Sequence, residues 1–183
     1  MVSLTGEAFR KKAEKLIEKL RAEDGFYLVH MEDARGEATL FGNGYICLLL
    51  PLTVGEEEKA DTGRSVWKLM REKFWSDEAQ KNMKWVPLPK VSELKPGRDR
   101  EHPTKCQLAA TDMPVLNDGR ILSIAGECAT YPFAVQARYL KMALQLATFG
   151  GQKDVRSVYN PLCLWFDDDE GNQALGVIMP MRE

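Results

Sequence analysis

Apolar residues recur at helical spacing close to the amino terminus. Thr5 is a typical N-cap residue, and the apolar positions after it fall three or four residues apart, at Phe9, Ala13, Leu16, Ile17 and Leu20. The opposite side of this predicted helix carries a basic stripe interleaved with glutamates: Lys12, Lys15 and Lys19. Charged helix faces are usually only solvated, so the stripe alone does not establish a contact with DNA.

Short apolar runs separated by turn residues follow this helix. The runs 26–31, 37–41 and 45–50 predict strands, and Gly42-Asn-Gly44 is a strong reversal signal between the last two. A helix followed by antiparallel strands is typical of an α+β fold.

The character of the chain changes at about residue 53 and changes back at about residue 104. Charged residues and prolines dominate this stretch, which also contains a predicted helix at 66–74. We therefore expect a single domain, residues 1–183, with an insertion at about 53–104. The aromatic residues of the insertion are interspersed with basic ones: Trp67, Phe74, Trp75 and Trp85. They predict either anchors on the body of the domain or a surface for single-stranded nucleic acid.

Helix and strand signals return in the second half. Strands are predicted at 105–110 and 120–125, a second helix at about 135–148, and further strands from 155 to the end. The polar stripe of the second helix contains no acid: Arg138, Lys141 and Gln145. Near the carboxyl end Met179 and Met181 flank Pro180, which favours the end or edge of a sheet because proline has no N–H donor. The two methionines are either core residues or a soft pocket for a partner's apolar side chains.

Composition narrows the class of protein. A hydrophobic fraction of 44% is that of a globular chain, no apolar run approaches membrane-spanning length, and no signal peptide is evident, so we expect a cytoplasmic protein. A net charge of −2 argues against a wholly basic nucleic-acid binder but allows a basic face.

Cysteines without a Cys-x-x-Cys pair predict buried thiols. With no nucleotide loop or nucleophile motif, we expect no enzyme, no cofactor and no metal. The acidic run 167–170 leaves a metal-dependent hydrolase as an alternative.

Three stretches form recognisable motifs: Val177-Ile-Met-Pro-Met-Arg182, Gln136-Ala-Arg-Tyr-Leu-Lys-Met-Ala-Leu144 and Thr39-Leu-Phe-Gly-Asn-Gly-Tyr-Ile-Cys-Leu-Leu-Leu-Pro-Leu52. Together they resemble a single domain of the bacterial sliding clamp, the β subunit of the replicative DNA polymerase. The chain departs from that family in having room for one domain where a clamp subunit has three. It also departs in the 53–104 insertion and in ending at Glu183 rather than at an apolar residue.

The resemblance implies a DNA-clamp-like domain, with two helices packed on antiparallel sheets. It implies contacts with double-stranded DNA, without sequence specificity, from Lys12, Lys15, Lys19, Arg138 and Lys141. It also implies a carboxyl-terminal hydrophobic groove for short motifs of replication or repair proteins, lined by Gln136, Tyr139, Val177, Met179, Pro180, Met181 and Arg182. A chain that encircles DNA would have to form a homo-oligomeric ring. The alternative is a monomeric adaptor or regulator of replication or repair proteins that does not encircle DNA.

Overall fold

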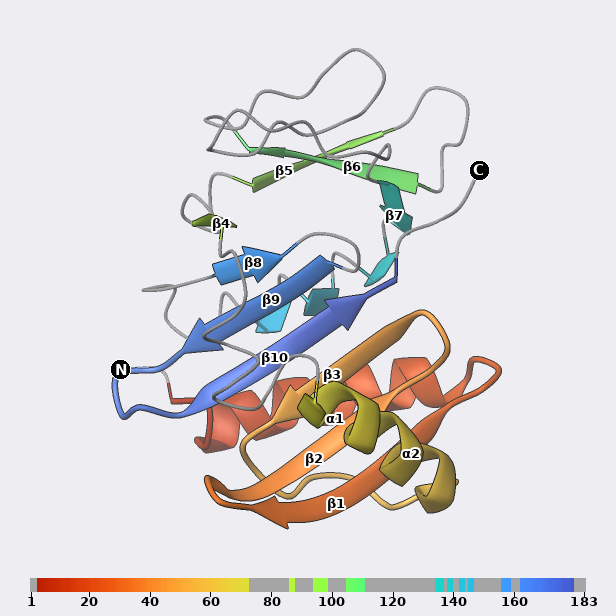
Figure 1. Ribbon diagram of the computed structural model, residues 1–183, viewed down its shortest axis with the longest axis vertical. Coiled ribbons are helices and arrows are strands. Elements are labelled where there is room, and N and C mark those ends of the chain that lie inside the picture. Colours follow the sequence, from red (N-terminus) through yellow and green to blue (C-terminus); the bar gives the residue numbers. More distant parts are fainter. Residues whose placement is uncertain are drawn as a thin grey trace.

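The computed structural model describes residues 3–72, 86–87, 94–98, 105–110, 134–136, 138–139, 142–143, 145–146, 156–158 and 162–179 of the 183-residue chain. The fold is α+β, as predicted, and contains helices α1 (Glu7–Arg21) and α2 (Ala60–Met70) (Figure 1). Its strands, in chain order, are β1 (Tyr27–Asp33), β2 (Gly36–Gly42), β3 (Ile46–Leu50), β4 (Val86–Pro87), β5 (Leu94–Arg98), β6 (Lys105–Ala110), β7 (Ala134–Gln136), β8 (Arg156–Val158), β9 (Leu162–Asp167) and β10 (Gln173–Ile178).

Helix α1 buries one side along its whole length. All the apolar residues that predict its inner face are buried, which confirms the helical spacing: Phe9, Ala13, Leu16, Ile17 and Leu20. Burying a side chain of leucine or phenylalanine size stabilises a fold by about 1.5–3 kcal/mol, so this side fastens the helix to the sheet. The N-cap is Gly6 rather than the predicted Thr5, whose N–H donates to Ser3 Oγ at 3.2 Å in a local turn.

The main sheet joins two units of similar build. Its strands lie in the order β1-β2-β3-β10-β9-β8-β4, and neighbouring strands are antiparallel. In the first unit α1 precedes the meander β1-β2-β3. In the second unit, helical residues between 138 and 146 precede the meander β8-β9-β10. The last strands of the two units, β3 and β10, pair with each other, so that Val177 lies opposite Cys47.

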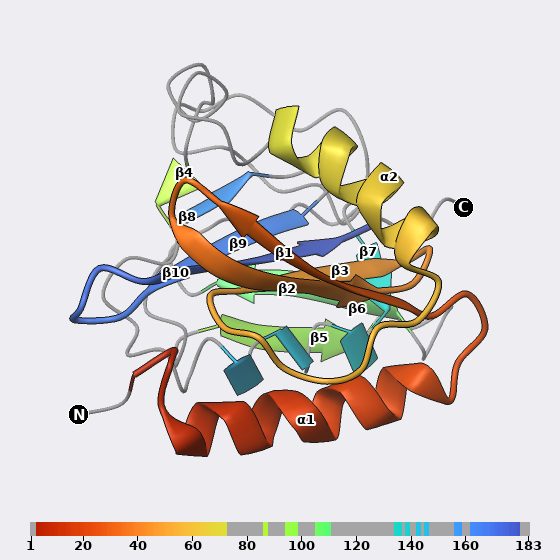
Figure 2. The same cartoon turned by 90° about the horizontal axis from the view of Figure 1, so that it is seen from below.

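The helices cover both faces of this sheet. Helix α1 and the helical residues between 138 and 146 lie on one face, and α2 lies on the other, over β1 and β2 (Figures 1 and 2). A Cβ atom on Gly176 would lie 3.7 Å from Ala143 Cβ, so β10 packs directly on the second helical segment. Side chains alternate along a strand, and Val177 therefore points to the α2 face, in a core cluster with Leu49 and Met70.

Two predicted helices differ from the structure at their starts. The helix predicted at 66–74 begins at Ala60, and Trp67 packs against the core cluster, which makes this tryptophan an anchor on the body of the domain. Val135 and Gln136, predicted as the first turn of the second helix, instead belong to β7 and pair with β6 in a separate three-stranded sheet. Valine is β-branched and therefore favours a strand. The strand that pairs with it, β6, cannot be recognised from the spacing of the residues around Val135. The strand predicted at 120–125 lies outside the described residues.

Residues 53–58, which we call the edge strap, cover part of the outer edge of β1. Leu28 donates to the Glu58 carbonyl at 2.9 Å, and the Glu58 N–H donates back at 3.1 Å. The next outward-facing amide, that of His30, donates to Glu57 Oε1 at 3.0 Å. Backbone donors that would otherwise offer a site for another strand are therefore occupied by the chain itself.

Helix α1 holds the edge strap from its other side. Arg10 donates to the Thr53 carbonyl at 2.7 Å, and Arg21 forms an ion pair with Glu58. The first residues of the predicted insertion thus pack on the domain's own helix and sheet.

Gly63 permits the close approach of α2 to β1. A Cβ atom at this position would lie 2.8 Å from Val29 Cγ1 and 3.0 Å from Val29 Cβ, and the second of these atoms is fixed to the strand backbone. Overpacking of this kind costs about 1–3 kcal/mol, against a gain of about 1 kcal/mol in helix propensity when alanine replaces glycine.

We expect Gly63→Ala to lower the free energy of unfolding by up to about 2 kcal/mol, because the clash outweighs the gain in propensity. Urea denaturation followed by circular dichroism measures this change. The matched control is Gly44→Ala, where a Cβ atom meets nothing within 4 Å. Equal stability of the two variants would contradict the tight packing of α2 on β1.

Asp168 fastens the amino-terminal segment to the turn between β9 and β10. Its carboxylate accepts hydrogen bonds from the N–H groups of Leu4 at 3.1 Å, Glu170 at 2.9 Å and Asn172 at 2.8 Å. Burial alone would raise the pKa of Asp168, but the hydrogen bonds from Asn172, Leu4 and Glu170 outweigh burial and hold the pKa below its ordinary value.

We expect Asp168→Ala to lower the free energy of unfolding by about 1.5–3 kcal/mol at pH 7, the usual contribution of a hydrogen bond to a charged group. The folded pKa lies below the unfolded one, so this contribution is complete above about pH 4 and is lost as the pH falls through the folded pKa. Urea unfolding of both proteins between pH 7 and pH 2 measures it. A difference in the free energy of unfolding between wild type and Asp168→Ala that persists at the lowest pH would contradict this assignment. An equal loss of stability in Asp169→Ala would contradict it as well.

Candidate functional site

The turn between β2 and β3 exposes an aromatic ring. Asn43 Oδ1 accepts the backbone N–H groups of Tyr45 at 2.8 Å and Ile46 at 3.1 Å, while its own N–H donates to the Ile46 carbonyl at 2.9 Å. Gly42 is required here, because a Cβ atom would overlap the Ile46 carbonyl oxygen. The predicted reversal at Gly42-Asn-Gly44 is thereby confirmed, and the turn leaves the Tyr45 side chain 55% exposed.

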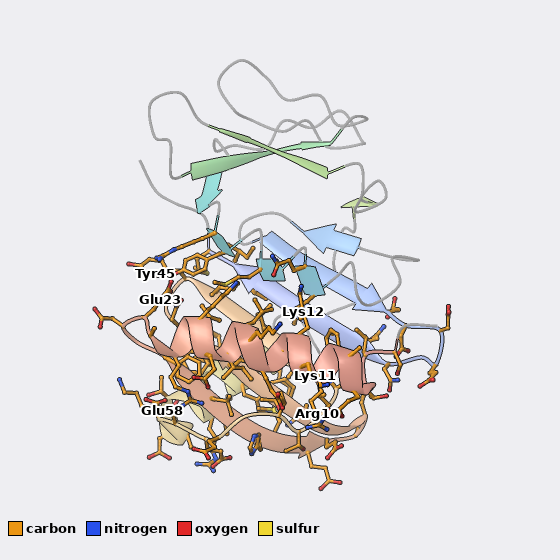
Figure 3. The ribbon with its side chains drawn as sticks, turned by 180° about the vertical axis from the view of Figure 1, so that it is seen from behind. Arg10, Lys11, Lys12, Glu23, Tyr45 and Glu58 are labelled. Atoms are coloured by element: carbon orange, nitrogen blue, oxygen red, sulfur yellow. The ribbon has the colours of Figure 1, made fainter. Side chains whose placement is uncertain are left out.

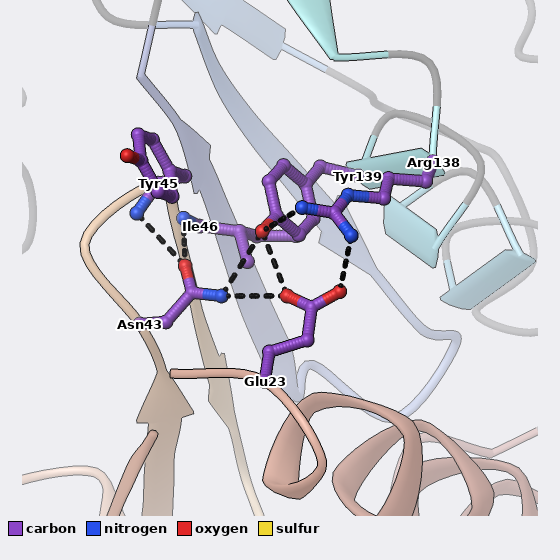
Figure 4. A network of polar contacts seen from close by, with 6 residues as sticks. All are labelled: Glu23, Asn43, Tyr45, Ile46, Arg138 and Tyr139. Atoms are coloured by element: carbon purple, nitrogen blue, oxygen red, sulfur yellow. Dashed lines mark hydrogen bonds and ion pairs between the residues drawn. The ribbon is translucent and has the colours of Figure 1, made fainter. Parts of the chain in front are cut away.

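A carboxylate between the two units organises the polar groups behind this turn (Figure 4). Glu23, just after α1, accepts hydrogen bonds at Oε2 from the Tyr139 hydroxyl at 2.7 Å and from Asn43 Nδ2 at 2.9 Å. Its Oε1 atom forms an ion pair with Arg138 at 2.8 Å. The Tyr139 hydroxyl also accepts from Asn43 Nδ2 at 3.1 Å and from Arg138 at 3.0 Å. We call these four residues the Glu23 network.

The protonation state of Tyr139 suits this network. Burial raises the pKa of the Tyr139 phenol, and the hydrogen bond to Glu23 raises it further. The phenol therefore stays neutral at physiological pH and donates its proton to the carboxylate. The Arg138 guanidinium lies over the Tyr139 ring, 4.7 Å from its centroid, and holds the ring in place.

Two exposed residues, Tyr45 and Met179, are joined through their backbones at this end of the sheet. The exposed large hydrophobic residues among those described are Tyr45 (55%), Leu69 (52%) and Met179 (47%). The Met179 N–H donates to the Tyr45 carbonyl at 2.8 Å, and the Tyr45 ring stacks on Tyr139 at a centroid distance of 6.2 Å. We call Tyr45 and Met179 the terminal patch. Tyr45 was not predicted as a site residue, although an aromatic side chain within a tight turn between two strands is a signal for an exposed ring.

The structure separates two of the predicted groove residues and brings others together. Val177 is only 4% exposed and packs on the α2 face, whereas Tyr139 lies on the opposite face of the sheet. Tyr139 and Met179 both contact Tyr45, so they share one neighbourhood. Gln136 lies in β7, opposite Lys105. The remaining predicted residues, Pro180, Met181 and Arg182, lie outside the described residues.

The predicted DNA contacts occupy different surroundings. Lys15 and Lys19 are exposed on α1, and together with Lys11, Glu14 and Glu18 they line a shallow depression of about 460 Å³. Lys12 is half-buried on the flank of α1 opposite Arg10 (Figure 3). Arg138 is engaged by Glu23, and Lys141 lies outside the described residues. Positive and negative side chains therefore alternate along the exposed side of α1.

The acidic turn and Cys47 have structural roles. Both oxygens of Asp168 accept hydrogen bonds from the turn and the amino-terminal segment. Cys47 is buried as a free thiol, and burial raises its pKa to about 12, so it stays protonated at neutral pH. Within the part of the chain that the structure describes, no three His, Cys, Asp or Glu residues are placed to hold a metal ion.

Comparisons of the chain with protein-family models, with curated proteins and with solved structures find no match. Among the described residues, no helix combines the length and the apolar character needed to cross a membrane.

Proposed function

We propose that this chain is a non-enzymatic, sliding-clamp-like protein that binds short peptide segments of partner proteins at the terminal patch. The observation that carries the proposal is that the exposed residues Tyr45 and Met179 are neighbours, joined by a backbone hydrogen bond of 2.8 Å. An exposed tyrosine and a flexible thioether are typical of surfaces that accept apolar side chains of a partner.

The build of the sheet supports the clamp-like part of the proposal. Each unit places a helical segment before a three-stranded meander, and both segments cover the same face of the sheet. This agrees with the two helices on antiparallel strands that the resemblance implies. The terminal patch lies where β3 begins and β10 ends, beside the pairing of these two strands.

The terminal patch is also ordered in the free protein. The backbone N–H of Tyr45 is held by Asn43, its carbonyl by Met179, and its ring rests on Tyr139. A surface that is already ordered loses less conformational entropy on binding, and more of the contact energy then appears as affinity.

We expect Tyr45→Ala combined with Met179→Ala to weaken the binding of a labelled clamp-motif peptide by about tenfold or more, since apolar anchors dominate such contacts. Fluorescence anisotropy measures the dissociation constant, and thermal unfolding checks that the fold is intact. The matched control is Leu69→Ala, which removes an exposed leucine from α2. Unchanged affinity in the double variant would remove the terminal patch as the binding site.

A second version of the proposal, an adaptor that does not encircle DNA, draws support from the edge strap. Edge-to-edge joining of subunits needs free strand edges, and on β1 the amides of Leu28 and His30 are already bonded to the strap. The alternating charges on α1, where Glu14 and Glu18 lie among the lysines, also weaken its attraction for phosphates. We therefore favour the adaptor over a ring.

We expect light scattering to give the mass of a monomer across a range of protein concentrations, with and without duplex DNA, because the strap covers the β1 edge. A concentration-dependent ring, or one that assembles on DNA, would contradict the adaptor and restore a clamp that encircles DNA. In that case the charge reversal Lys15→Glu with Lys19→Glu should abolish assembly on DNA, whereas the control Glu14→Gln should not.

A further inference from the structure

We propose that Glu23 is a positioning residue for the terminal patch. Its carboxylate bonds to Asn43, Tyr139 and Arg138, and the first two of these side chains in turn hold Tyr45 in place. This inference rests on the proposed function of the patch, and it assigns to a residue behind the patch a part in recognition.

The amide of Asn43 is the first connection. Its Nδ2 group donates to Glu23 and to the Tyr139 hydroxyl, which leaves Oδ1 to accept the N–H groups of Tyr45 and Ile46. An amide turned the other way would place its NH₂ group against two N–H donors. The carboxylate therefore fixes the amide orientation on which the turn depends.

The ring of Tyr139 is the second connection. Its hydroxyl is held by three partners, and the ring carries the stacked ring of Tyr45, with an interplanar angle of 15°. The hydrogen bond from this hydroxyl joins residues 116 positions apart in the sequence. Glu23, in the first unit, thus fixes the position of the Tyr139 ring in the second unit. The Tyr45 ring stacks on that ring.

The charge of Glu23 is needed as well as its oxygen atoms. One carboxylate satisfies the Arg138 guanidinium and two further donors at once. A glutamine retains one accepting oxygen, but its NH₂ group would face either the guanidinium or the other donors. Charge-assisted hydrogen bonds are about twice as strong as neutral ones, so glutamine should preserve only part of the arrangement.

The test measures peptide affinity together with hydrogen exchange at the Tyr45 amide. We expect Glu23→Ala to weaken the labelled clamp-motif peptide by about tenfold and to speed exchange of the Tyr45 amide by a similar factor, about tenfold, as the turn loosens. Glu23→Gln, which keeps the fold if alanine does not, should lie between wild type and Glu23→Ala. The matched control is Asp24→Ala, an exposed carboxylate one residue further on.

A double-mutant cycle separates positioning from general destabilisation. If Glu23 acts through Tyr45, Glu23→Ala should cause no further loss of affinity once Tyr45 is alanine. Additive losses, or unchanged exchange at the Tyr45 amide in both Glu23 variants, would overturn the inference. Failure of the wild-type protein to bind the peptide would instead overturn the proposed function, and the exchange measurement would still decide whether Glu23 positions Tyr45.

Discussion

The antiparallel pairing of β3 with β10 is the interaction on which the rest of the structure depends. It joins Ile46 to Ile178 and Leu49 to Leu175, and so merges two meanders into one sheet with helical segments on a shared face. Both strands are buried at nearly every position. Because the hydrophobic contribution to stability scales with buried apolar area, the pairing of β3 with β10 contributes more to stability than the polar contacts around it.

The Glu23 network and the terminal patch follow from the pairing of β3 with β10. Pairing of β3 with β10 brings the turn before β3 beside the residue that follows β10, which is why the Met179 N–H reaches the Tyr45 carbonyl. It also places Tyr139 against the same turn. The polar network then fills the junction between the units, where buried donors and acceptors have to find partners. Packing thus determines the location of the patch, and hydrogen bonds determine its shape.

Elements with local signals were predictable from the sequence, and those that depend on distant partners were not. The inner face of α1 and the reversal at Gly42-Asn-Gly44 follow from spacing and turn chemistry alone. In contrast, Val135 enters a strand because β6 pairs with it, and nothing in the local pattern shows that partner.

The candidate site was partly predictable for the same reason. Met179 was predicted from its place beside a proline, and it is exposed. That Val177 and Tyr139 lie on opposite faces depends on the register of β10, which a motif match does not contain. The contacts of Glu23 with the second unit are also beyond local patterns, because they span most of the chain.

The edge strap has a consequence for the order in which the chain folds. Contacts within the first unit and its strap join residues close in sequence, and short loops close sooner and at lower entropic cost than long ones. We therefore expect the first unit to form first, with β1 already covered, and the wholly apolar strand β3 (Ile46–Leu50) to pair with β10 only once the far end of the chain is available. On that order of events, β3 would be the exposed and aggregation-prone edge of the nascent chain during synthesis.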